Sequence, residues 1–162
     1  MKTKKPIIVT SEAYIEYVED SIIRTGVEPE KIILEPYSKN TFPAISLAVM
    51  TSLLKQKDEN FIVTPSDHYI SKNKEFHDSC EIAKKNIECN GLILLGVKPE
   101  NSSSEFGYIT AKSLKEDINE VQNFIEKPNN HKAKKMIVNK NVLWNSGMFI
   151  FQGPWFIEAT KT

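Results

Sequence analysis

The chain has 162 residues, of which 40% are hydrophobic and 26% are charged, and this suits a globular domain large enough to bury a core. Its 21 Lys and Arg residues balance its 21 Asp and Glu residues, which disfavours nucleic-acid and anionic-membrane partners. The apolar run behind the basic start is too short for a signal peptide, and no stretch approaches the ~20 apolar residues of a membrane span. We therefore expect a cytoplasmic protein.

Short apolar runs alternate with amphipathic segments through the first hundred residues. Strands are predicted at residues 6–10, 31–35, 61–64 and 91–97, the last with the most buried character. Helices are predicted at residues 11–25, behind a cap at Asn40 and Thr41, and at residues 73–89. This alternation favours an α/β fold with a largely parallel sheet.

The pattern changes after residue 97. A Ser-rich loop is expected over residues 98–110, followed by strands at "NEVQNFIEKP" (119–128) and "NSGMFIFQG" (145–153). A short helix is expected between them at 129–139, and Gly153 with Pro154 predicts the start of a last helix. In parallel α/β sheets, ligands bind at the carboxyl ends of the strands.

Several motifs of nucleotide-binding and hydrolytic enzymes are absent. None of the six glycines forms G-x-G-x-x-G, which weakens a dinucleotide oxidoreductase interpretation. The run "GLILLG" has the outer spacing of a phosphate-binding loop, but Val97 stands where that loop requires Lys. No Asp-x-Asp, G-x-S-x-G or H-E-x-x-H occurs.

The polar residues that follow strands each have a structural and a functional interpretation. Asp67 suits a turn or helix cap as well as a metal ligand, and His68 suits a structural role. Glu126 and Lys127 suit a solvated charge pair that faces opposite ways unless the backbone bends. Gly147, inside an apolar run, indicates close approach of a ligand or of backbone.

Five segments, taken together and in order, resemble the sugar-1-phosphate nucleotidyltransferases. They are "ILEPYSKNTFPAI", "VTPSDHYI", "SEFGYI", "FIEKP" and "LWNSGMFIF". The last is most similar to the branch of mannose-1-phosphate guanylyltransferases, and the resemblance runs from about residue 6 to the final residue. It implies a Rossmann-like nucleotide-diphospho-sugar transferase fold with a mixed, mainly parallel central sheet.

The resemblance also implies a reaction and its residues. Family members join GTP to mannose 1-phosphate by Mg²⁺-assisted in-line attack on the α-phosphate, giving GDP-mannose and pyrophosphate. By position, Asp67 matches the Mg²⁺ ligand and Lys127 the lysine that holds the sugar phosphate. The remaining matches are Asn40 and Thr41 near the base and ribose, Gly107, Glu126 and Asn145 in the mannose pocket, and His68 and Glu105 as supports.

The sequence also departs from the family pattern. Lys39 stands where Arg is usual, and Phe42 where a small residue is common. The family's G-G-x-G-x-R-L-W-P loop, its second Mg²⁺-binding aspartate and the fused isomerase domain of some members have no counterpart. We therefore expect residues 1–162 to form a partial domain with little transferase activity alone. The alternatives are a non-catalytic sugar-nucleotide-binding remnant and another nucleotide-sugar pyrophosphorylase.

A structural expectation follows for the sheet. In the strand order of such folds, the family's first strand lies between the segments "PIIVT" and "FIVT". Without it, we expect closure of the sheet between these segments, strand exchange in a homodimer, or poor solubility.

Overall fold

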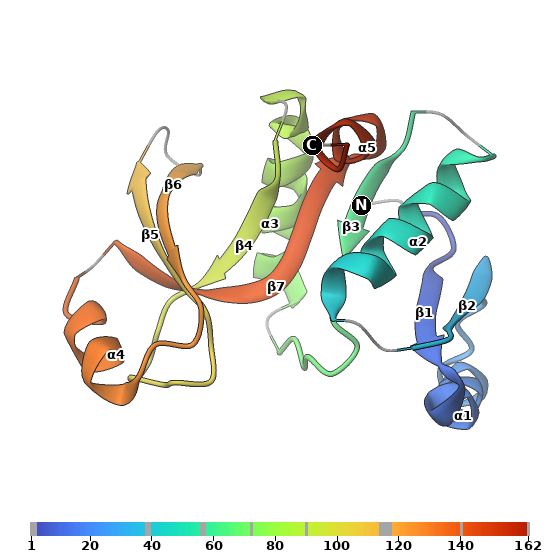
Figure 1. The fold of residues 1–162 in the computed structure, drawn as a ribbon, viewed down its shortest axis with the longest axis horizontal. Helices are drawn as coiled ribbons and strands as arrows, with labels where there is room; N and C mark the ends of the chain where they lie inside the picture. Colours follow the sequence, from blue (N-terminus) through green and yellow to red (C-terminus); the bar gives the residue numbers. More distant parts are fainter. Residues whose placement is uncertain are drawn as a thin grey trace. The chain divides into compact units, whose positions relative to one another are not determined.

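The computed structural model describes residues 3–37, 40–55, 58–71, 73–89, 91–113, 118–139 and 141–161. The chain divides into two compact units (Figure 1). Unit 1 comprises Met1–Phe61 with Gln152–Thr162, and unit 2 comprises Ile62–Phe151. Each unit is described by itself. No helix among the described residues is long and apolar enough to cross a membrane.

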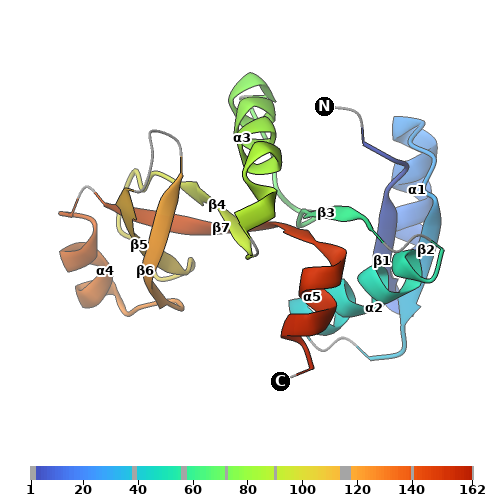
Figure 2. The same cartoon turned by 90° about the horizontal axis from the view of Figure 1, so that it is seen from above.

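Unit 1 begins with a parallel β-α-β element. Strand β1 (Ile7–Ser11) pairs with β2 (Lys31–Glu35) in parallel, from Ile7 opposite Lys31 to Ser11 opposite Glu35. The crossover consists of the 3-10 helix η1 (Glu12–Tyr14) and helix α1 (Ile15–Thr25), which lies beside both strands in Figure 2. Gly26 ends α1 with φ 66°, a left-handed conformation that glycine adopts without steric cost.

The rest of unit 1 is a pair of helices, α2 (Thr41–Leu53) and α5 (Gly153–Ala159), in mutual contact. The rings of Phe42 and Phe156 approach with centroids 5.8 Å apart. Gly153 allows the close packing, because a Cβ there would lie 2.8 Å from the Phe61 ring and 2.9 Å from Leu53. The predicted helix starts at Thr41 and Gly153 are therefore confirmed.

Unit 2 is built on a five-stranded sheet. Its strands are β3 (Asn60–Val63), β4 (Ile93–Val97), β5 (Tyr108–Ser113), β6 (Asn119–Ile125) and β7 (Val142–Gln152). The order is β3-β7-β5-β6, and β4 also pairs with β7; the β4–β7, β5–β6 and β5–β7 pairs are antiparallel. The unit boundary falls within β3 and before the last residue of β7.

Two helices cover the sheet of unit 2 with separate apolar clusters. Helix α3 (Asn73–Lys85), continued by the 3-10 helix η2 (Ile87–Cys89), packs Cys80, Ala83 and Ile87 against Ile150 of β7. Helix α4 (Asn130–Met136) packs Ala133 against Tyr108 and Val142, below the β5–β6 hairpin in Figure 1.

The mixed α/β architecture confirms the expected fold class, with three corrections in detail. Among the described registers only β1–β2 is parallel, because β5 and β6 form a hairpin and β7 returns beside β5 and β4. Strand β7, not β4, is the most buried, since it is hydrogen-bonded to three neighbours. Sheet closure between "PIIVT" and "FIVT" is not seen among the described strands, because β1 pairs with β2 and β3 with β7.

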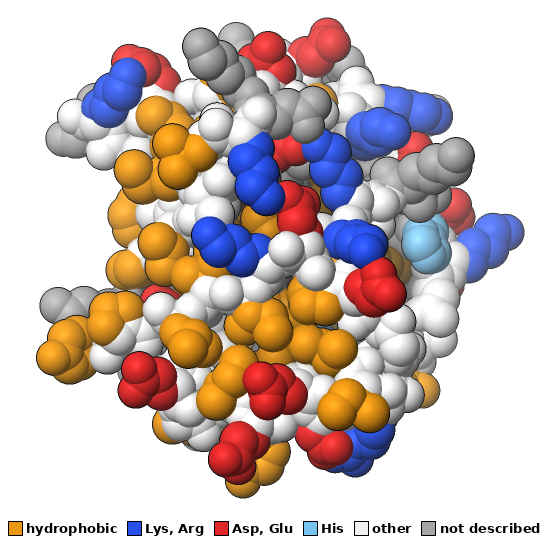
Figure 3. Space-filling model, turned by 90° about the vertical axis from the view of Figure 1, so that its right-hand side faces the viewer, with side chains coloured by type: hydrophobic (Ala, Val, Ile, Leu, Met, Phe, Trp, Pro, Cys, Tyr) orange, Lys and Arg blue, Asp and Glu red, His pale blue; other side chains and the backbone are white. Residues whose placement is uncertain are grey.

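Helix α2 is apolar on opposite sides. Val49 is buried within unit 1, whereas Leu47, Met50 and the following Leu54 line another face with exposed fractions of 37%, 58% and 89%. Figure 3, which turns the right-hand side of the view in Figure 1 toward the viewer, shows hydrophobic side chains gathered between charged ones. We call Leu47, Met50 and Leu54 the apolar stripe of α2.

Candidate functional site

Gly107, Glu126 and Asn145 lie together on one face of the sheet in unit 2. The backbone N–H of Asn145 donates a hydrogen bond of 2.8 Å to the carbonyl oxygen of Gly107. A Cβ at Gly107 would lie 3.0 Å from Glu126 Oε2, 3.6 Å from Asn145 Cβ and 2.9 Å from Phe124 Cζ. A carboxylate, an amide and an aromatic ring thus surround bare backbone, an arrangement suited to a ligand that carries several hydroxyl groups.

Asn145 belongs to a bulge in β7. Asn145 faces Gly96 and Phe149 faces Leu94, so three residues of β7 stand opposite Leu95 alone. Within the bulge, Gly147 has φ 70°, and a Cβ there would lie 3.4 Å from Pro65 Cγ. A contact of 3.4 Å is ordinary, so the positive φ, rather than a close approach of backbone or ligand, is what favours glycine at this position.

The backbone bends where Glu126 and Lys127 follow β6. The strand ends at Ile125, and Lys127 has φ 39°, so the alternation of a regular strand does not continue. Lys127 and Asn40, with φ 65°, are the non-glycine residues with positive φ in the described part of the chain. Such conformations cost on the order of 1–3 kcal/mol and concentrate at functional sites.

Asp67 lies on the turn after β3 with 85% of its side chain exposed. His68 Nε2 is 3.9 Å from its Oδ1 atom, and the supporting role expected of His68 stays a prediction. Among the described residues, no three His, Cys, Asp or Glu side chains gather as a metal-ion site. Mg²⁺ is commonly held by one or two carboxylates together with substrate phosphates. Asp67 therefore fits an ion that arrives with a phosphate ligand, and does not fit a metal cage of protein ligands alone.

Asn40 and Thr41 lie in unit 1, at the start of α2. The side chain of Asn40 makes no capping hydrogen bond within the described residues, contrary to the predicted cap, because its positive φ directs the chain away from cap geometry. Glu105, expected as a support, is exposed, and its backbone N–H donates to Ser103 Oγ at 3.1 Å.

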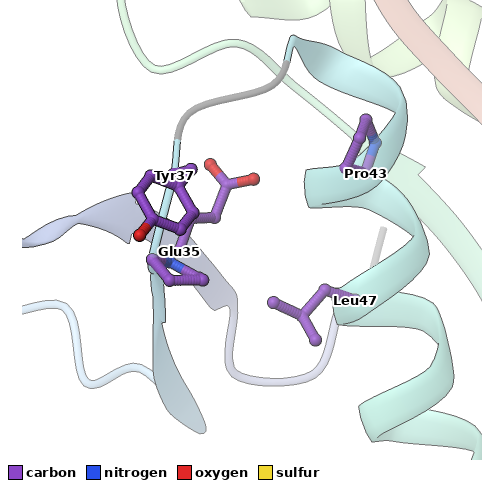
Figure 4. Close-up of a pocket in the computed structure, with 5 residues that line it drawn as sticks. Glu35, Tyr37, Pro43 and Leu47 are labelled. Atoms are coloured by element: carbon purple, nitrogen blue, oxygen red, sulfur yellow. The ribbon is translucent and has the colours of Figure 1, made fainter.

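A cavity of about 330 Å³ opens beside the Asn40 segment. Figure 4 shows Glu35 and Tyr37 at the end of β2 facing Pro43 and Leu47 of α2 across it; Pro36 completes the lining. Glu35 and Tyr37 are not among the residues predicted from the sequence. The sequence does contain an indication of Glu35, which is the last residue of a parallel strand. Ligand contacts in α/β proteins lie at this position.

A family model described as nucleotidyl transferase matches residues 1–161 of the chain. The alginate biosynthesis protein AlgA of Pseudomonas aeruginosa is 29% identical over 159 residues, covering 96% of this chain and 33% of that protein. A mannose-1-phosphate guanylyltransferase of Escherichia coli is 32% identical over 165 residues, covering 98% and 36%. The chain thus spans about a third of the length of the curated relatives it matches.

Solved structures share the fold. A structure described as mannose-6-phosphate isomerase from Helicobacter pylori superposes with a TM-score of 0.80 at 31% identity, over 94% of this chain and 58% of that chain. A structure described as mannose-1-phosphate geranyltransferase from Thermus thermophilus has a TM-score of 0.80 at 24% identity, over 94% and 43%, and shows likeness of fold alone.

Proposed function

Because the chain belongs to the nucleotidyl transferase family, we propose that it contributes to the formation of GDP-mannose and pyrophosphate from GTP and mannose 1-phosphate. The observation that carries this proposal is the convergence of Gly107, Glu126 and Asn145. The name of the Escherichia coli relative supports the choice of sugar and nucleotide.

The pocket around Gly107 suits the sugar. The carboxylate of Glu126 accepts hydrogen bonds from sugar hydroxyl groups, and the amide nitrogen of Asn145 donates one. The missing side chain at Gly107 lets the Phe124 ring and the Glu126 carboxylate lie close to the backbone, where a Cβ would be 2.9 Å and 3.0 Å from them. Two polar groups at fixed positions distinguish sugars by the orientation of their hydroxyls.

The cavity of unit 1 suits the nucleotide base. Guanine carries two adjacent N–H donor groups, which match the two oxygens of the Glu35 carboxylate at the cavity. Tyr37 and Leu47 supply apolar surface for the flat ring. Asn40 and Thr41 follow in sequence, where ribose contacts are proposed.

The phosphate chemistry falls to Asp67 and Lys127. The oxygen of the sugar phosphate attacks the α-phosphorus in line, a new P–O bond forms, and the bond to pyrophosphate breaks without a covalent enzyme intermediate. Lys127 holds the attacking phosphate by its positive charge. Asp67 would hold a magnesium ion, which neutralises phosphate charge when bound.

Calorimetric titration with GDP-mannose tests the proposal. We expect saturable binding by the wild type and binding about tenfold weaker by Asn145→Ala, the cost of one hydrogen bond to a buried ligand group. Asn123→Ala is the matched control, because Asn123 is exposed on β6 and neighbouring strand residues face opposite ways. Equal affinity of wild type and Asn145→Ala would contradict the proposed pocket.

Two further measurements separate the alternatives. Pyrophosphate release from GTP, mannose 1-phosphate and Mg²⁺ that falls in Asp67→Asn indicates a working transferase, whereas binding without release indicates a non-catalytic sugar-nucleotide protein. Tighter binding of UDP-glucose or ADP-glucose than of GDP-mannose would assign the chain to another nucleotide-sugar branch.

A further inference from the structure

We propose that Ser146 is a positioning residue that holds Asn145 and Gly147 in place for sugar binding, an inference that rests on the proposed function. Ser146 is the first residue of the β7 bulge, and its hydroxyl contacts two backbone groups. Its role would be exerted through its neighbours in sequence.

The hydroxyl of Ser146 replaces ladder hydrogen bonds that the bulge interrupts. It donates to the carbonyl oxygen of Leu95 on β4 at 2.6 Å, and it accepts from the backbone N–H of Met148 at 3.2 Å. If the hydroxyl were removed, the Leu95 carbonyl and the Met148 N–H would lose this hydrogen-bond partner. The free energy of folding would then carry the cost of partly buried polar groups that lack a partner. One side chain thus forms hydrogen bonds to β4 and to the bulged stretch of β7.

The hydrogen bonds of Ser146 fix the bulge and thereby orient the side-chain amide of Asn145. The backbone N–H of Asn145 is bound to Gly107, and its Oδ1 accepts from the N–H of Gly147 at 3.2 Å. With Oδ1 engaged inside the bulge, the amino group of the same amide is the donor presented to a ligand. A change in the path of residues 146–148 would rotate this amide, and misplacement by about 1 Å is costly for a binding group.

The bulge that Ser146 stabilises also contacts the segment that leads to Asp67. Gly147 adopts φ 70° and its α-carbon faces Pro65, with 3.4 Å between the position of a Cβ and Pro65 Cγ. Pro65 precedes Asp67 by two residues. The bulge therefore lies between the proposed sugar pocket and the proposed metal ligand, and Ser146 holds the segment that joins them.

The test compares Ser146→Ala with Ser146→Thr, which retains the hydroxyl, by titration with GDP-mannose and by amide hydrogen exchange of the unliganded chain. Ser79→Ala is the matched control, because the Ser79 hydroxyl also bonds a backbone carbonyl, that of Glu75 at 2.9 Å, in the same unit. We expect Ser146→Ala to bind about tenfold more weakly. We also expect faster exchange of the Asn145 and Met148 amides in this variant. Ser146→Thr should restore both properties, and Ser79→Ala should change neither.

The outcomes separate this inference from the proposed function. Unchanged exchange in Ser146→Ala overturns the inference, since the bulge would then not depend on the hydroxyl. Faster exchange with unchanged affinity, while Asn145→Ala binds weakly, also overturns it and leaves a structural role. A wild type that binds no sugar nucleotide overturns the proposed function, and the binding role of Ser146 with it.

Discussion

Gly107 shows how one residue without a side chain lets its neighbours lie close to the backbone. A Cβ there would approach Phe124 Cζ to 2.9 Å and Glu126 Oε2 to 3.0 Å, closer than ordinary contacts allow. Both atoms are the far ends of side chains that can rotate, so the fold can absorb an added methyl group. The Glu126 carboxylate, however, has to move when a methyl group is added at Gly107.

Gly107→Ala should therefore weaken binding more than it weakens the fold. We expect affinity for GDP-mannose to fall about tenfold, because the Glu126 carboxylate is displaced from its ligand-binding position. The free energy of unfolding should fall by about 1 kcal/mol, as for a small overpacked site. Calorimetric titration and urea unfolding measure the two effects.

Gly26→Ala is the control, because it should lower stability without changing the affinity for GDP-mannose. A Cβ at Gly26 meets nothing within 4 Å, but its φ of 66° is strained for any residue with a side chain. We expect a loss of stability of about 1 kcal/mol and no change in affinity. If both variants lowered affinity equally, local crowding at Gly107 would not be the cause.

At the scale of elements, Glu59 joins the N-terminal segment, α2 and β3 within unit 1. Its carboxylate accepts hydrogen bonds from Lys4 Nζ and Ser52 Oγ, and only 12% of its side chain is exposed. Burial by itself raises the pKa of Glu59, but the bonds from Lys4 and Ser52 and the charges of Lys4 and Lys55 outweigh it, so the pKa is lowered.

The lowered pKa predicts a pH-dependent contribution to stability. Because the folded-state pKa lies below the unfolded-state value, the ionised carboxylate stabilises the fold at neutral pH, and this contribution is lost as the pH falls through the folded-state pKa. Glu59→Gln should lower the free energy of unfolding by about 1 kcal/mol at pH 7. Urea unfolding at pH 7 and at successively lower pH should show the difference from wild type shrinking; a constant difference would contradict the assignment.

The apolar stripe of α2 predicts self-association at high concentration. Leu47, Met50 and Leu54 are exposed on one helix face, and contiguous apolar surface favours association. Met50→Glu should raise the monomer fraction in sedimentation velocity while changing stability by less than about 0.5 kcal/mol. Val138→Glu, at an exposed valine in unit 2, is the control. An equal effect of both variants would point to net charge rather than to the stripe.

At the scale of the whole molecule, the two units differ in how much apolar surface they bury. Among the described residues, unit 2 contributes most of the buried hydrophobic side chains, including Tyr108, Ile150 and Phe151, whereas unit 1 contributes Ile33, Val49 and Phe156. The sheet of unit 2 is also larger, with five strands against two in unit 1. Small sheets with little buried surface are less stable.

Unit 1 should therefore unfold before unit 2. The two tryptophans report on them separately, because Trp144 lies in unit 2 and Trp155 in unit 1. We expect the fluorescence of Trp155, observed in Trp144→Phe, to change at lower urea than that of Trp144, observed in Trp155→Phe. Coincident transitions, with unchanged stability of both variants by circular dichroism, would show one cooperative unit instead.

The sequence by itself determined the family and most of the elements, but not strand β5 (Tyr108–Ser113), because residues 98–110 were expected to form a loop. Apolar periodicity placed α1, β2 and α3 close to their observed positions, because the period of a helix or strand is a local property. The family resemblance selected Gly107, Glu126 and Asn145, which the structure brings together, and also Asn40 and Lys127, which it shows with positive φ. Their functional roles stay predictions.

Tertiary structure alone decided how the strands pair and where the bulge lies. The antiparallel partners of β7, the burial of β7 rather than β4, and the register shift opposite Leu95 all arise between segments far apart in the chain. Local sequence patterns carry little information on such pairing, because register depends on the packing of both faces and on the loops that connect the strands. The contact between Ser146 and Leu95 is of this kind, and no local pattern predicted it.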